Sequence, residues 1–215
     1  MPFDFLRRKK GPHAPTGETP TAAAAAGTGI AFDGLTEDWR LVGRMLVDGR
    51  LSDALNKREP IAITDVSWAP IDGSEPLAPA SGLKTVDPYD LVIVLAGEDT
   101  QPAMSGDERN AHRVHKVSYE VALEAPPYRI IGTVYLYPGS EPDSLLNRSS
   151  EMFVPVVEAT AMMGDRQIGD GKATAILVNR AYLRGVEQVD ARTGERHEKM
   201  PGSSMGGVNW TDRTR

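Results

Sequence analysis

The feature that most constrains the fold of this chain is an internal repeat, because the same order of segments occurs twice, about 90 residues apart. Each copy has a strand-like segment with an arginine and a glycine, a short segment that ends in asparagine, an apolar run and a closing segment. The first copy comprises residues 39–44, 51–56, 61–66 and 86–91, and the second comprises 128–133, 143–147, 154–159 and 178–183. The repeat predicts two small modules of one kind in tandem.

The repeat divides the 215 residues into five parts. We predict a first module at 29–96 and a second at 114–190, joined by a polar linker at 97–113. Residues 1–28, a peptide followed by a proline- and alanine-rich tether, and the polar tail 191–215 are predicted to be disordered, because such compositions bury too little apolar surface to fold. Each module is near the lower size limit for an independent core, so we expect the two modules to stabilise each other.

Hydrophobic periodicity predicts strands rather than helices. Residues 117–123 alternate between apolar and less apolar side chains, the pattern of a half-buried strand, and a second strand is expected at 128–137. The short segments 52–56 and 143–147 predict single helical turns, capped by the side chain at their start. Asp170-Gly171 has the composition of a connection between strands. We therefore predict an all-β protein of two small barrels or sandwiches.

Alternation within the paired strands predicts which face is buried. The core-facing residues are expected to be Leu41, Gly43, Met45 and Val47 in the first copy and Ile130, Gly132, Val134 and Leu136 in the second. The opposite face of the second copy carries Ile131, Tyr135 and Tyr137. A half-apolar outer face needs partial cover, from the sister module or from another chain, which leaves a homo-oligomer open.

Composition excludes several classes of function. The chain has no cysteine, so disulfides, thiolate metal sites and a cysteine nucleophile are excluded. The net charge of −6 disfavours nucleic acid as a partner, because phosphate neutralisation supplies most non-specific affinity. No apolar stretch approaches the roughly 20 residues that span a bilayer, and the N-terminus lacks the apolar core of a signal peptide. These features favour a cytoplasmic location.

The chain offers few groups for catalysis. Its four histidines are His13, His112, His115 and His197, and only His115 begins a predicted strand. Aspartates such as Asp53 lie mostly in turn-like contexts, where they cap backbone amides. No Walker-type loop and no dinucleotide fingerprint is present in the sequence. We therefore expect no catalytic residues, no metal ligands and no cofactor, and predict that the chain is not an enzyme.

Two kinds of polar residue recur in both copies, Arg40 with Arg129 and Asn56 with Asn147. One interpretation gives them structural roles, because asparagine after two apolar residues satisfies a turn with its own side chain. The alternative is a pair of equivalent ligand sites, one built from Arg40 and Asn56 and the other from Arg129 and Asn147. That alternative requires the two side chains of each pair to converge in space.

The repeated pattern resembles known proteins in two ways. The aromatic-Arg-apolar-apolar-Gly strand, the turn at 51–56 and the apolar strand that follows resemble a small bacterial module of unknown function. Residues 143–147, Asp-Ser-Leu-Leu-Asn, and 183–186, Leu-Arg-Gly-Val, also resemble the two motifs of the Sm-like RNA-binding barrel. In that family these positions help to form a uridine pocket. The resemblance implies RNA or small-ligand binding by the second module through Asn147 and Arg184, and the recurring Arg129 would be part of the same site.

The N-terminal peptide combines an apolar cluster with positive charge. The cluster is Phe3, Phe5 and Leu6, and the cations are Arg7, Arg8, Lys9 and Lys10. This combination binds an anionic membrane surface or docks onto a protein groove, although it also occurs as a solubilising start. We therefore predict a non-enzymatic adaptor that this peptide recruits to a protein partner, in the cytoplasm or at the periphery of the inner membrane. RNA or small-ligand binding by an Sm-like second module is the alternative.

Overall fold

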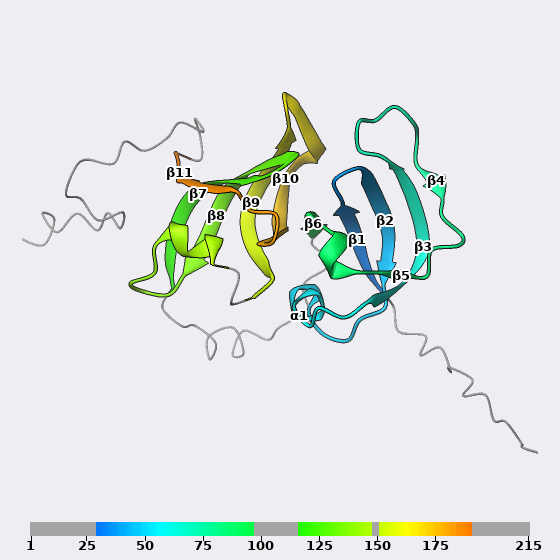
Figure 1. Cartoon of the computed structure of the whole chain (residues 1–215), viewed down its shortest axis with the longest axis horizontal. Coiled ribbons are helices and arrows are strands. Elements are labelled where there is room, and N and C mark those ends of the chain that lie inside the picture. The colour runs from blue at the N-terminus through cyan, green and yellow to red at the C-terminus, as the bar shows by residue number, and fades with distance from the viewer. Residues whose placement is uncertain (1–28, 97–115, 148–150, 191–215) are drawn as a thin grey trace, which may run out of the picture.

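The structure is a computed structural model that describes residues 29–96, 116–147 and 151–190 (Figure 1). In chain order its elements are β1 (Ile30–Leu35), β2 (Trp39–Met45), α1 (Leu51–Asn56), β3 (Ile61–Pro70), β4 (Ala78–Pro79), β5 (Thr85–Val86), η1 (Pro88–Asp90), β6 (Ile93–Ala96), β7 (Val117–Ala125), β8 (Tyr128–Leu136), η3 (Pro142–Leu146), β9 (Phe153–Met163), β10 (Arg166–Asn179) and β11 (Gly185–Gln188). The prediction of an all-β protein is confirmed. The predicted tails, 1–28 and 191–215, and the predicted linker, 97–113, lie outside the described residues.

The strands form one large antiparallel sheet in the order β11-β7-β8-β9-β10-β6-β1-β2-β3-β4, and β5 pairs with β3. Strands β1 to β6 make the N-terminal half and β7 to β11 the C-terminal half, and the two halves lie side by side in Figure 1. Pairing of β6 with β10 joins them into a continuous sheet. Two separate barrels or sandwiches are therefore not confirmed, and the division into modules stays a prediction.

The continuous sheet has a hydrophobic core in each half. The C-terminal core includes Val121, Leu123, Tyr128, Ile130, Ile176 and Val178, and the N-terminal core includes Phe32, Leu41, Met45, Leu55, Ile63 and Leu177. Successive residues of a strand point to opposite faces, so Val178 faces the C-terminal core while its neighbour Leu177 faces the N-terminal core. Strand β6 and the residues 175–178 of β10 that pair with it are apolar on both faces for this reason.

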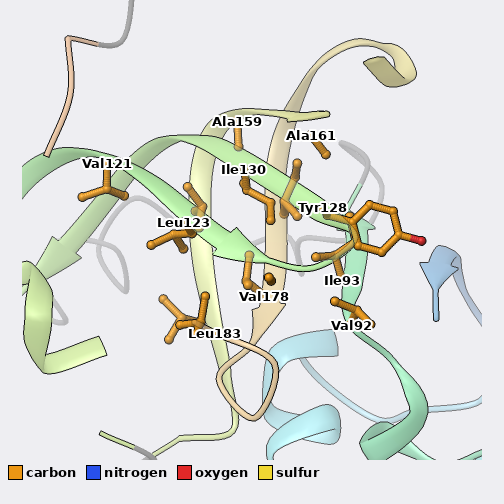
Figure 2. Packing of buried hydrophobic residues seen from close by; sticks show 14 of the residues in the cluster. Val92, Ile93, Val121, Leu123, Tyr128, Ile130, Ala159, Ala161, Val178 and Leu183 are labelled. Atoms are coloured by element: carbon orange, nitrogen blue, oxygen red, sulfur yellow. The ribbon is translucent and has the colours of Figure 1, made fainter. Parts of the chain in front are cut away.

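The cores of the two halves exchange side chains. Leu35, Val92 and Ile93 come from the N-terminal half but pack in the C-terminal core, where Figure 2 shows Val92 and Ile93 near Tyr128. In return, Met152, Phe153 and Leu177 pack in the N-terminal core. Burying one such side chain contributes about 1.5–3 kcal/mol, so either half alone would lose a substantial part of its core. The expectation that the two parts of the chain stabilise each other agrees with this packing.

The same irregularity occurs at a glycine in each half. The register of β2 with β3 shifts between Val42 and Arg44, and that of β8 with β9 shifts between Ile131 and Thr133. A Cβ atom on the intervening Gly132 would lie 2.9 Å from the Ala159 backbone, closer than packing allows. A Cβ atom on Gly43 would likewise lie 3.0 Å from the Thr64 carbonyl oxygen. Both glycines therefore permit close approach of the next strand.

Most local predictions hold, with two corrections. Both single helical turns form, as α1 and η3, and Leu41, Met45, Ile130 and Val134 are buried as expected. The predicted side-chain caps are wrong, because neither helix has a side-chain hydrogen bond at its N-cap. The predicted connection at Asp170-Gly171 is also wrong. These residues lie inside β10, where the register with β9 shifts between Ile168 and Ala173, so the turn-like composition marks a bulge.

Candidate binding surface

Two exposed tryptophans stack on each other where β2 begins and β3 ends. The ring centroids of Trp39 and Trp68 are 4.6 Å apart with an interplanar angle of 22°. The two residues are 40% and 41% exposed. Leu41 lies opposite Trp68 in the β2–β3 register and is buried in the N-terminal core. The tryptophan pair therefore extends the apolar face of the core to the surface, and aromatic side chains in such positions are typical of protein interfaces.

Acidic residues flank this aromatic pair on two linked turns. In the first turn, the Thr36 hydroxyl accepts hydrogen bonds from the Asp38 and Trp39 amides at 3.2 and 2.9 Å. The Ile71 amide donates to the Asp38 carbonyl at 3.0 Å, which joins the second turn to the first. Glu37, Asp38, Asp72 and Glu75 are all exposed on these turns. We call these four carboxylates, with Trp39 and Trp68, the acidic tryptophan surface.

Hydrogen bonding and nearby charge keep the surface acidic. Hydrogen bonds from Ser74 hold the pKa of Asp72 below its usual value. Arg40 is paired with Asp33, through Nε to Oδ1 at 2.9 Å and Nη2 to Oδ2 at 2.6 Å. Arg166, at the start of β10, donates from Nη1 to the Asp72 carbonyl at 2.8 Å and from Nη2 to the Ile71 carbonyl. The five carboxylates Asp33, Glu37, Asp38, Asp72 and Glu75 stand against these two guanidinium groups.

A groove of about 370 Å³ lies between the two halves, behind the strands that carry the tryptophan pair, and Glu75 of the acidic turns reaches its lining. Its lining combines Arg40, Ala69, Ile71 and Leu77 of the N-terminal half with Arg166 and Ile168 of the C-terminal half. Because Arg40 follows Trp39 along β2, the groove and the tryptophan pair lie on opposite faces of the strand. The Tyr128 hydroxyl donates to the Thr36 carbonyl at 2.7 Å, and burial raises the pKa of Tyr128. This phenol fixes the β1–β2 turn against the C-terminal half.

The structure places Arg40 and Asn56 apart. Asn56 ends α1 and exchanges two hydrogen bonds with the Phe153 backbone, from Nδ2 to the carbonyl at 3.4 Å and from the amide to Oδ1 at 2.7 Å. Arg40 stands near the start of β2, whereas α1 follows the other end of that strand (Figure 1). The rise of a strand puts Arg40 about 17 Å from Met45, where β2 ends. Asn56 therefore joins the two halves, and Arg40 belongs to the groove.

Two of the three residues singled out in the second copy lie together. The Arg129 guanidinium is 3.0 Å from the Glu124 carboxylate, an ion pair without hydrogen-bond alignment, and the Arg184 amide donates to the Glu124 carbonyl at 2.7 Å. Glu124 thus connects the residues that precede β11 with the start of β8. The Asn147 carbonyl accepts from Arg180 Nη1 at 3.0 Å. This contact uses the backbone of Asn147 and not its side chain, and its partner is Arg180 and not Arg129.

Sequence reasoning missed the tryptophan pair as a candidate site. Trp39 stood at the start of the repeated strand, but Trp68 has no aromatic counterpart at its place in the second copy, so the repeat did not point to it. Extending the apolar run 61–66 into a longer strand, paired with β2, would have placed Trp68 opposite Leu41 and on the same face of the sheet. The missing signal was the cross-strand register, which brings residues 29 positions apart into contact.

The remaining expectations concern metals, membranes and the N-terminal peptide. Within 29–96, 116–147 and 151–190, no group of three or more His, Cys, Asp or Glu side chains could hold a metal ion. Among those same residues, no helix is long and apolar enough to cross a membrane. The four histidines and the peptide formed by Phe3, Phe5, Leu6, Arg7, Arg8, Lys9 and Lys10 lie outside the described residues. Comparison with family models, curated proteins and solved structures found no match for this chain.

Proposed function

We propose that this chain is a non-enzymatic adaptor or scaffold that binds a protein partner through the acidic tryptophan surface. The observation that carries the proposal is the stacked Trp39–Trp68 pair, 40% and 41% exposed at the edge of a well-packed core. Tryptophan is the residue type most enriched at the energetic centres of interfaces, and an exposed, pre-stacked pair loses little side-chain entropy when a partner covers it. The flanking carboxylates favour a basic partner.

An adaptor needs a rigid body, and buried polar contacts between the halves support one. Asn179 at the end of β10 is fully buried, and its Nδ2 donates to the Leu91 carbonyl at 2.8 Å. Its backbone amide donates to the Val92 carbonyl at 2.9 Å. Hydrogen bonds in a dry interior are costly to break, so they oppose separation of the halves. We infer that both halves move together and present one fixed surface.

Paired local geometry supports the proposal that two copies of one module form this body. In the N-terminal half, the Asp87 carboxylate accepts from the Tyr89 amide at 2.9 Å. In the C-terminal half, the Asn179 side-chain oxygen accepts from the Ala181 amide, also at 2.9 Å. Each turn leads into the strand that pairs with the first strand of its half, β6 with β1 and β11 with β7. Duplication of a module explains this correspondence more economically than two independent origins.

The N-terminal peptide supplies recruitment in this proposal. Three apolar side chains beside four cations would bind an anionic surface weakly and reversibly, since each basic residue contributes about 1 kcal/mol there. The chain would then work in the cytoplasm or at the periphery of the inner membrane, with the acidic tryptophan surface holding its partner. A homo-oligomer would make membrane contact firmer by multivalency but is not required.

Partner capture from cells tests this function. The tagged full-length chain, its Trp68→Ala variant and its Tyr89→Ala variant are purified in parallel, and bound proteins are quantified by mass spectrometry. Tyr89 is 50% exposed in η1 and serves as the matched control for loss of a surface aromatic. We expect one basic partner to be retained by the parent and the control but reduced at least about tenfold by Trp68→Ala, the scale of a hot-spot residue. Equal recovery from all three forms would refute the proposed surface.

RNA or small-ligand binding by the C-terminal half is the second candidate. Tyr135 and Tyr137 are 52% and 60% exposed, and Lys116 Nζ lies 5.3 Å from the centroid of the Tyr137 ring. Exposed aromatic rings beside cations provide stacking platforms for single-stranded bases. Arg184 is exposed near Arg129 and would add phosphate contacts. Binding of a uridine-rich oligonucleotide that weakens with salt and is lost in Arg184→Ala would favour this candidate, and no binding at low salt would remove it.

A further inference from the structure

We infer that residues 3–10 of this chain dock on its own acidic tryptophan surface. The chemistry of the two parts is complementary. Phe3, Phe5 and Leu6 offer apolar side chains to the exposed Trp39–Trp68 stack, and the four cations at 7–10 offer positive charge to the carboxylates on the flanking turns. Arginine and lysine also bind the faces of tryptophan rings by cation–π attraction. A single segment of the chain therefore matches both the apolar and the acidic character of the surface.

The carboxylates lie close enough together to receive a short basic segment. Asp38 and Ile71 are joined by a backbone hydrogen bond of 3.0 Å, which holds the two acidic turns side by side next to Trp39. Arg40 is engaged by Asp33 with contacts of 2.9 and 2.6 Å, so this local cation is already neutralised. The guanidinium of Arg166 donates its hydrogen bonds to backbone carbonyls, and its positive charge acts on the Asp72 carboxylate only through space. The acidic charge of the turns is therefore available to cations from elsewhere.

The length of the intervening chain permits docking within one molecule. The tether enters β1 at Ile30, and β1 runs about 20 Å before the turn that leads to Trp39. Leu6 and Gly29 are 23 residues apart in the sequence, and a random-coil chain of that length would have a root-mean-square span of roughly 25–30 Å. A tether whose span matches the distance between sites gives an effective concentration in the millimolar range. Weak contacts suffice at that concentration.

Docking would make the N-terminal peptide a regulated element. In the docked state the peptide covers the tryptophan pair, so neither the peptide nor the surface is free for a partner. An anionic membrane would compete for the peptide, and a basic protein would compete for the acidic tryptophan surface. Either competitor would separate the peptide from the surface and so expose both. This regulation rests on the recruiting role proposed above, but the docking itself is a property of the purified chain and is measured without membrane or partner.

Tryptophan fluorescence of purified protein tests the inference. The chain has three tryptophans, and Trp210→Phe leaves Trp39 and Trp68 as the reporters. A synthetic peptide of residues 1–10 is titrated into the full chain and into a chain lacking residues 1–10, both with Trp210→Phe. We expect a saturable fluorescence change in the truncated chain, and at least about tenfold weaker apparent binding to the full chain, because the tethered copy competes. Equal binding to both chains, or binding to neither, would overturn the inference.

Charge reversal supplies a second variant that leaves the tryptophans in place. Asp38→Lys combined with Asp72→Lys should weaken peptide binding to the truncated chain at least about tenfold, and raising the salt concentration should weaken it in the parent. The control is Glu141→Lys with Asp143→Lys, two exposed carboxylates near η3, which should leave binding within about twofold. The same loss in both variants would reveal a general charge effect and overturn the proposed site. A fluorescence difference that appears only at high protein concentration, together with dimers in sedimentation, would make a second copy the occupant and refute docking within one chain.

Discussion

Replacement of Asn179 by alanine should destabilise the whole described structure, because this side chain satisfies backbone groups on both sides of the junction. Its Nδ2 donates to the Leu91 carbonyl at 2.8 Å and its Oδ1 accepts from the Ala181 amide at 2.9 Å. Alanine leaves that carbonyl and that amide without these partners. An unsatisfied buried group costs about 1–3 kcal/mol, so we expect a loss of about 2–4 kcal/mol in the free energy of unfolding.

The assay is urea unfolding followed by both tryptophan fluorescence and far-ultraviolet circular dichroism. Because the cores of the halves share side chains, the two signals should change in one transition for the parent and for the variant. The matched control is Asp87→Ala, at the corresponding turn of the N-terminal half. Its carboxylate accepts from the Tyr89 amide at 2.9 Å, and this exposed bond should be worth about 1 kcal/mol.

The comparison has clear refuting results. If Asn179→Ala costs no more than Asp87→Ala, the side chain does not hold the junction. If the parent unfolds in two separate transitions, the halves are independent domains and the reasoning from the shared cores is wrong. Asn179→Asp sharpens the test, because the carboxylate would face the Leu91 carbonyl and its pKa would be raised in the folded state. This variant would then keep its stability below about pH 4, the pKa of aspartate in an unfolded chain, and would lose stability as the pH rises above it.

Three further predictions concern single positions. Gly132→Ala should cost about 1–3 kcal/mol by overpacking, since its Cβ would lie 2.9 Å from Ala159, whereas Gly82→Ala, with open space around it, should change urea midpoints by little. Asn56→Ala should lower the free energy of unfolding by about 1–3 kcal/mol without changing the affinity for any ligand, and an affinity change at unaltered stability would restore the ligand-site interpretation. Burial raises the pKa of Tyr128 in the folded state, so its contribution to the free energy of unfolding is present below about pH 10, the pKa of tyrosine in an unfolded chain. That contribution is lost as the pH rises above this value. Alkaline unfolding curves should therefore be less steep for Tyr128→Phe than for the parent, and identical slopes would contradict the assignment.

The candidate site shows where reasoning from the sequence reached its limit. Arg40 was identified by its recurrence, and it does line the groove between the halves. Asn56 recurred equally, but it bonds the backbone of β9, a contact across 97 residues. Recurrence indicates that a residue type is needed without saying what it contacts. Trp68 was passed over for the opposite reason, because it lies outside the recurring positions yet stacks on Trp39.

The misassigned connection at Asp170-Gly171 has a similar cause. Turn-forming residues indicate that the backbone leaves regular geometry, and both a reversal and a bulge satisfy that requirement. Gly169 and Gly171 have φ values of 80° and 142° within β10, so the irregularity is real. The strand continues after it because residues 173–179 pair with β9 on one side and residues 175–178 pair with β6 on the other. Pairing with the neighbouring strands, rather than local composition, therefore made these residues a bulge within β10 and not a connection between two strands.

By itself the sequence determined the local structure of this protein. Alternation with a period of two predicted the strands, and short polar-start segments predicted the single helical turns. These features depend on contacts between residues near in sequence or on backbone sterics, which composition reports directly. Only the tertiary structure decided that β6 and β10 pair, that the two cores exchange side chains, and that Trp39 and Trp68 meet at an acidic surface. An apolar run indicates that both faces of a strand are buried, but it does not name the strand beside it, because hydrophobic burial is non-directional and long-range register depends on the packing of the whole sheet.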